Sequence, residues 1–167
     1  MNNQFVRAPV VPIAGRAGKP PAKPWVVVVG YDGSPAAGRA LDQAVEMLRN
    51  RDGAIEVVYV TKPPGSAYLA ADTLAGVLQG LDAQTAILAS DVRRQLVGQD
   101  LSWHFQRRDG AVRSELIKVA TDLDHRYGGA AEIMIVVGGP THWYHHLGGS
   151  VGSSVVRADH FPVVVVP

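Results

Sequence analysis

Short valine-rich runs that alternate with segments of helical periodicity constrain the fold of this chain more than any other feature. Residues 25–30 and 133–137 are almost entirely apolar, which is typical of strands buried on both faces of a parallel sheet. Residues 54–60 and 163–166 have the same character. In residues 101–105, apolar and polar side chains alternate, and this period of two predicts a further strand at the exposed edge of the sheet.

Between these runs, apolar residues recur at helical spacing. Ser34 is a favourable N-cap and Pro35 suits the first helical position, so a helix is predicted to begin there and to continue to about Leu48. Three further helices are predicted at residues 70–97, from Val112 to the glycine pair Gly128-Gly129, and at residues 149–158.

The resulting order alternates strand and helix from the first strand to the last. Since parallel strands require right-handed crossovers, this order predicts an α/β fold, a single doubly wound sheet of five parallel strands with helices on both faces. Ligands of such sheets bind beyond the carboxyl ends of the strands, where the strand order reverses. The loops after the first and fourth predicted strands are therefore the expected ligand site.

The 167 residues suit one domain, expected at residues 25–167 after a Pro/Gly-rich arm at residues 1–24. The arm is expected to be an extended, disordered tail, although its apolar residues would also suit a segment that lies along a partner protein or a sister subunit. Absence of cysteine excludes disulfides and thiolate metal sites, and no apolar run is long enough to span a bilayer. The apolar stretch of the arm is interrupted by prolines, unlike a signal peptide, so a cytoplasmic protein is expected. The 16 basic and 15 acidic residues give no argument for nucleic acid or membrane as a partner.

Residues at both ends of the predicted domain carry a family resemblance. The strand–turn–helix sequence at residues 26–34 and 40–44 resembles the opening of universal stress proteins, including its Asp-Gly-Ser turn. Residues 136–138, 149–151 and 161–166 are similar to the closing half of that family. The resemblance covers residues 25–167 and implies a Rossmann-like sheet of the adenine nucleotide alpha hydrolase type, a role in stress response, and ATP or another adenine nucleotide as ligand.

The resemblance also implies which residues meet that nucleotide. Asp32 would hydrogen-bond the nucleotide, and Val60 would line the base pocket. Glycines in the later loops would let main chain approach the phosphates, and amides at a following helix N-terminus would meet the anion. The complete set implied to bind the nucleotide is Gly30, Asp32, Val60, Val137, Gly138, Gly149, Ser150 and Val151.

The loop after the fourth predicted strand departs from the pattern of ATP-binding members. That pattern is Gly, two residues, Gly, nine residues, then Gly-Ser or Gly-Thr. Gly138 and Gly149-Ser150 match its ends, but Thr141 stands at the middle glycine and the stretch to Gly149 is two residues too short. Counting back from Gly149 makes Gly139 the middle glycine and leaves Val136 at the first position.

Three functional alternatives follow from these observations. The leading hypothesis is a nucleotide-binding regulatory module that, like its family, forms homodimers through residues 163–166. An adaptor without nucleotide, which docks on a partner through the arm, is the second. Slow ATP hydrolysis is the third, but no nucleophile with a general base can be identified, so no catalytic residue is named. No metal is expected, because His142, His145 and His146 have no carboxylate or cysteine nearby to complete a ligand set.

Overall fold

The computed structural model describes residues 23–62, 71–139 and 161–167. Within these residues the strands are β1 (Trp25–Gly30), β2 (Gly53–Thr61), β3 (Ser102–Asp109), β4 (Glu132–Gly138) and β5 (Val163–Val166). They form one sheet in the order β3-β2-β1-β4-β5, in which every neighbouring pair is parallel. The predicted five-stranded parallel sheet is confirmed, with β3 at one edge as the alternating pattern indicated.

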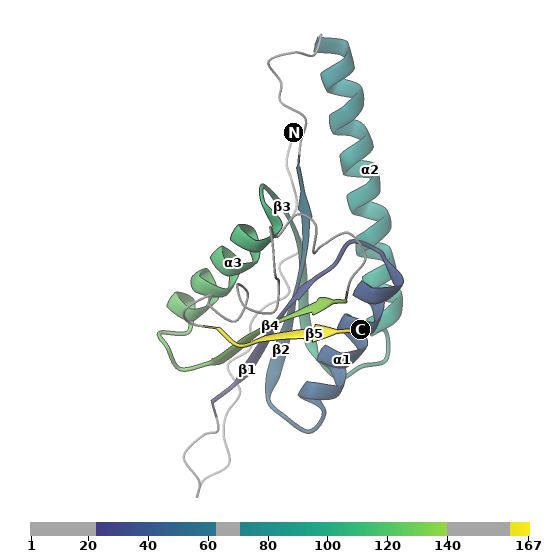
Figure 1. Ribbon diagram of the computed structural model, residues 1–167. Helices are drawn as coiled ribbons and strands as arrows, with labels where there is room; N and C mark the ends of the chain where they lie inside the picture. Colours follow the sequence, from purple (N-terminus) through teal and green to yellow (C-terminus); the bar gives the residue numbers. More distant parts are fainter. Residues whose placement is uncertain (1–22, 63–70, 140–160) are drawn as a thin grey trace, which may run out of the picture.

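Helices cover both faces of the sheet (Figure 1). The helices among the described residues are α1 (Pro35–Leu48), α2 (Ala71–Leu96) and α3 (Val112–Arg126). Side chains of α1 and α2 pack on one face, and those of α3 pack on the other. The doubly wound arrangement is therefore confirmed, whereas the helix predicted at residues 149–158 and residues 1–22 of the predicted arm lie outside the described residues.

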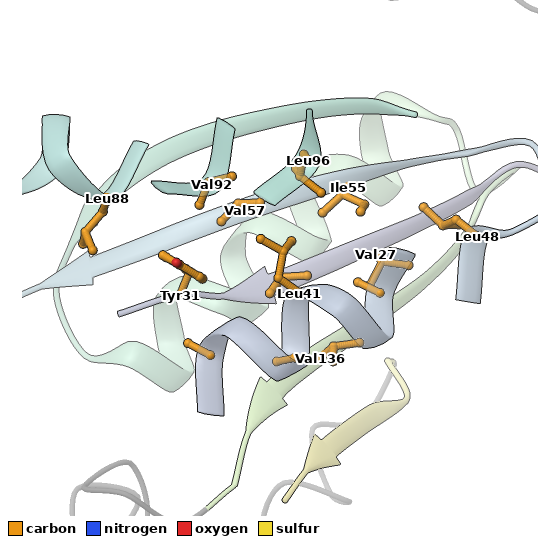
Figure 2. Packing of buried hydrophobic residues seen from close by; sticks show 14 residues of the cluster. Val27, Tyr31, Leu41, Leu48, Ile55, Val57, Leu88, Val92, Leu96 and Val136 are labelled. Atoms are coloured by element: carbon orange, nitrogen blue, oxygen red, sulfur yellow. The ribbon is translucent and has the colours of Figure 1, made fainter. Parts of the chain in front are cut away.

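Strand β1 lies at the centre of the packing. Val27, Val28 and Val29 have no exposed surface, because alternate residues of the strand face opposite helical layers. Val27 and Val29 belong to a cluster on one face that contains Leu41 of α1 and Val92 of α2 (Figure 2). This burial on both faces explains why the strand is a continuous valine run, without the polar alternation of an exposed sheet.

Local sequence signals place the ends of α1 and α3. The hydroxyl of Ser34 accepts a hydrogen bond from the amide of Ala37 at 3.1 Å and so caps the start of α1. At the end of α3, Gly128 and Gly129 have φ angles of 59° and 73°, and their amides donate back to carbonyls of the last helical turn. Both ends confirm the sequence prediction, since an N-cap serine and left-handed glycines are the residues that these positions require.

A buried carboxylate of β2 interrupts the apolar layer between the sheet and α3. Glu56 of β2 has 7% of its surface exposed, and its Oε1 lies 2.6 Å from Nδ1 of His104 on β3. The side-chain amide of Gln106 donates to the same oxygen. The hydrogen bond that His104 donates to Glu56 raises the pKa of His104 above its ordinary value of 6.5, although burial and the positive charge of Arg126 act in the opposite direction. The charged imidazole is therefore favoured in the folded protein.

This shift predicts a pH dependence of stability. Because the pKa of His104 is raised on folding, its contribution to stability is complete below the unfolded value and is lost as pH rises through the folded value. His104→Gln should therefore cost more unfolding free energy at about pH 5.5 than at about pH 8.5, by less than about 1 kcal/mol since the side chain is 40% exposed. Urea unfolding of the wild type, His104→Gln, Glu56→Gln and the double variant isolates the pair. A coupling energy that is equal at both pH values would contradict this prediction.

Candidate functional site

The strand order places the candidate site between β1 and β4. These two strands are neighbours, but the chain continues from β1 toward β2 and from β4 toward β5, on opposite sides. The two connections diverge at the carboxyl ends of β1 and β4, which is the position at which doubly wound sheets bind ligands. Gly30 and Gly138 are the last residues of the two strands.

A capped turn presents Asp32 directly after β1. The Oδ1 atom of Asp32 accepts a hydrogen bond from the amide of Ser34 at 2.9 Å, so the carboxylate is held beside the start of α1. Gly33 has a φ of 82° and supplies the left-handed residue that the turn needs. A side chain at Gly33 would also stand 2.6 Å from Cδ2 of Leu88 on α2. Asp32 is exposed at this end of the sheet and therefore in a position to meet a ligand.

The main chain of Val60 extends the site onto β2. Strand β1 ends opposite Val58, and the amide of Tyr31 donates to the carbonyl of Val58 at 2.9 Å. In a parallel sheet alternate residues direct their amide and carbonyl to the same neighbour, so those of Val60 point to the side where β1 has already ended. No described residue forms a main-chain hydrogen bond with Val60 from that side. Within residues 23–62, 71–139 and 161–167, Val60 thus has one donor and one acceptor that no main-chain group meets beside the Asp32 turn.

Gly138 is required by packing between β4 and α1. A Cβ atom at this position would lie 2.5 Å from the carbonyl carbon of Ala36 and 2.6 Å from its oxygen. The preceding residue, Val137, is half-buried and packs into the cluster on the α3 face. Strand β4 therefore ends against the first turn of α1. This contact alone requires a glycine at position 138, whether or not a ligand binds there.

The main-chain amide of Gly139 is used in a hydrogen bond within the sheet, so it is not available to bind phosphate. Its amide donates to the carbonyl of Val166 on β5, and a Cβ atom would lie 2.8 Å from Pro167. This arrangement disfavours the alignment that makes Gly139 the middle glycine of the loop pattern. Gly149, Ser150 and Val151 lie outside the described residues, so the structure brings together Gly30, Asp32, Val60, Val137 and Gly138 from the residues implied by the sequence.

Tyr31 lies under the Asp32 turn and was not singled out from the sequence. It is buried, and its pKa is raised first by that burial and then by the negative charges of Asp91 and Asp32, which Arg94 partly offsets. The phenol therefore stays protonated at neutral pH. Its position in the sequence could have indicated this burial, because an aromatic side chain directly after a buried strand is expected to pack under the following loop.

An ion-pair network joins the far side of the site to α2. Arg107 of β3 donates to Asp82 of α2 at 2.7 Å, and its Nε lies 3.6 Å from Asp109. The hydroxyl of Thr61 donates to the same Asp109. These contacts hold the ends of β2 and β3 against α2.

Two further findings concern metal ions and membranes. Across residues 23–62, 71–139 and 161–167 there is no group of three or more histidine or acidic side chains placed to hold a metal ion. No helix in this part of the chain has the length and apolar character needed to cross a membrane.

The geometry described so far defines an α/β protein with a doubly wound parallel sheet whose strand order reverses between β1 and β4. Residues 26–167 match the model of the universal stress protein family, and the chain belongs to that family. A comparison with curated protein sequences found no match.

Solved structures agree on the fold. A universal stress family protein from Burkholderia pseudomallei is 21% identical with a TM-score of 0.64, and the match covers 89% of this chain and 99% of that one. An Arabidopsis thaliana family member solved with AMP bound is 16% identical with a TM-score of 0.58, covering 86% and 91%. A universal stress protein solved in complex with cAMP is 22% identical with a TM-score of 0.53, covering 87% and 98%.

The contact between Gly138 and Ala36 leads to a stability prediction. Gly138→Ala should destabilise the protein by about 1–3 kcal/mol, because the added methyl group meets main chain that cannot move aside without shifting α1. Gly80→Ala is the matched control, since nothing lies within 4 Å of a Cβ at that helical position and alanine favours the helix. Urea unfolding of both variants measures the difference. Equal stability of Gly138→Ala and the wild type would show that the contact is not tight.

Proposed function

We propose that this protein is a cytoplasmic adenine-nucleotide-binding module that acts in stress response. The observation that carries the proposal is the juxtaposition of the exposed Asp32 carboxylate with the main-chain groups of Val60 at the switch point. A carboxylate can accept hydrogen bonds from ribose hydroxyls, and a main-chain donor and acceptor at strand spacing match the edge of an adenine ring. The relatives solved with AMP and cAMP support the same ligand class.

In this proposal the phosphates extend from the Asp32 turn toward the loop after β4. Gly138 begins that loop, and Gly149, Ser150 and Val151 would supply glycine flexibility and amides for the anion. ATP or another adenine nucleotide is the ligand, and binding rather than catalysis is the activity. Ligand occupancy would change the loops after β1 and β4, and thereby the affinity for a partner protein.

The departure at Thr141 favours one alternative, an adaptor that binds no nucleotide. Such a protein would dock on a partner through residues 1–24, and its candidate site would be a remnant of the family fold. Titration of the purified protein with nucleotides separates this alternative from the main proposal.

The test of the proposal is calorimetric titration of ATP, ADP and AMP. Asp32→Ala should weaken binding roughly 10- to 100-fold, because it removes a charged hydrogen-bonding group from the site. Asp52→Ala is the matched control, since Asp52 is also exposed but precedes β2 at the opposite edge of the sheet. Unchanged affinity in Asp32→Ala, or no binding by the wild type at millimolar nucleotide, would reject the proposal and favour the adaptor.

We further propose that the protein is a homodimer that pairs through β5. This strand is the outer neighbour of β4, and Val165 has 40% of its surface exposed on it. Among the described strands, β5 is an edge strand of four valines, and such an edge invites pairing with another strand, which a second copy would satisfy symmetrically.

Substitution in this strand tests the dimer. Val165→Lys should convert the dimer to a monomer, because a charged edge residue opposes pairing. Val97→Lys is the control, since Val97 is 74% exposed directly after α2 and lies away from β5. Light scattering on both variants and on the wild type measures the mass. A monomeric wild type, or a dimer that persists in Val165→Lys, would contradict the proposal.

A further inference from the structure

Helix α2 continues well beyond the carboxyl edge of the sheet (Figure 1). Leu88 marks the level of the edge, because its Cδ2 lies 2.6 Å from the position that a Cβ atom of Gly33 would take. The residues from Ala71 to Ile87 precede it, and at 1.5 Å per residue they correspond to about 25 Å of helix beyond the Asp32 turn. Here this segment is called the α2 extension.

One face of α2 is continuous from the core to the α2 extension. Leu88, Val92 and Leu96 are buried in the cluster under the sheet. The half-buried residues Leu81 and Thr85 precede them at spacings of four and three, and Val77 lies one further turn away. By contrast, Leu78 and Ile87 are 44% and 56% exposed. The half-buried face of this part of the helix therefore runs through Val77 and not through Leu78.

This face rises beside the candidate site. Leu81 stands one heptad above Leu88, and seven residues return a helix to nearly the same orientation, about 10 Å farther along its axis. Leu88 packs on the turn that carries Asp32, so Leu81 lies above that turn on the same side. The pair of Arg107 with Asp82 holds this part of the helix against β3.

A base that binds the main chain of Val60 by its edge would lie nearly in line with β2, with one ring face toward the α1 and α2 side of the sheet. On that side α2 passes the Asp32 turn at Leu88, and the α2 extension continues beyond it. Ligand sites bury most of a ligand against apolar side chains and use few polar groups for orientation. The exposed Asp32 and the main chain of Val60 supply the polar groups, but they supply no apolar surface for the ring.

We propose that Leu81, together with Val77, forms an apolar wall against which the adenine ring packs, and that the α2 extension thereby makes the site select ligands with a base. This inference rests on the proposed nucleotide binding and assigns its base specificity to a helix outside the Asp32 turn and the β4 loop. A ligand that has ribose and phosphate but no base gains nothing from this wall.

The test is calorimetric titration of AMP and of ribose 5-phosphate into the full chain. Leu81→Asn should weaken AMP binding about tenfold, because it removes apolar contact area from the ring, and should leave ribose 5-phosphate binding unchanged. Leu81→Met should keep AMP affinity within about twofold, since it conserves apolar volume. Ile87→Asn is the matched control, with the same kind of substitution on the exposed face of the same helix, and should leave both affinities unchanged.

The possible failures are distinguishable. If the wild type binds AMP and Asp32→Ala does not, while Leu81→Asn binds AMP as the wild type does, the nucleotide site stands and the wall is rejected. Equal losses in Leu81→Asn and Ile87→Asn would also reject it, because the effect would then come from a weakened helix, which their melting temperatures would report. If the wild type binds no AMP, the proposed function itself fails.

Discussion

Burial of β1 on both faces is the constraint on which the rest of this structure depends. Val27 and Val29 face α1 and α2, while Val26 and Val28 face α3, and all four are 2% exposed or less. A strand buried in this way must satisfy its main chain through neighbours on both sides, so β2 and β4 flank it in parallel. The position of the candidate site follows from this order. The chain leaves β1 toward β2 and leaves β4 toward β5, on opposite sides, so the two connections diverge at the end of β1.

The unequal lengths of neighbouring strands shape the site within this framework. Strand β1 ends opposite Val58, whereas β2 continues to Thr61 in register with β3. The step leaves the main chain of Val60 without a main-chain partner from the β1 side among the described residues, and α2 rises along the same side. In the proposed site, one edge for hydrogen bonds, one carboxylate and one apolar helix face would come together from three separate segments of the chain.

Glycine positions show how a packing requirement and a family pattern can coincide. Gly138 matches the start of the phosphate-loop pattern, yet the main chain of Ala36 already excludes any larger residue there. Gly139 donates its amide to Val166 and joins β4 to the end of β5. A glycine in this loop is therefore weak evidence by itself for phosphate binding. The arrangement of Asp32 and Val60 is stronger support for a nucleotide site.

The sequence by itself determined the strand–helix order, the parallel sheet, the edge position of β3 and the caps around α1 and α3, because these follow from periodicity and local main-chain preferences. It also placed Asp32 at the end of a buried strand. Only the tertiary structure decided that Val60 lies beyond the end of β1, that Ala36 leaves no room for a side chain at Gly138, and that the half-buried face of α2 continues through Val77 and not through Leu78. The physical reason is that each of these depends on the register and reach of segments far apart in the chain, which no local pattern encodes.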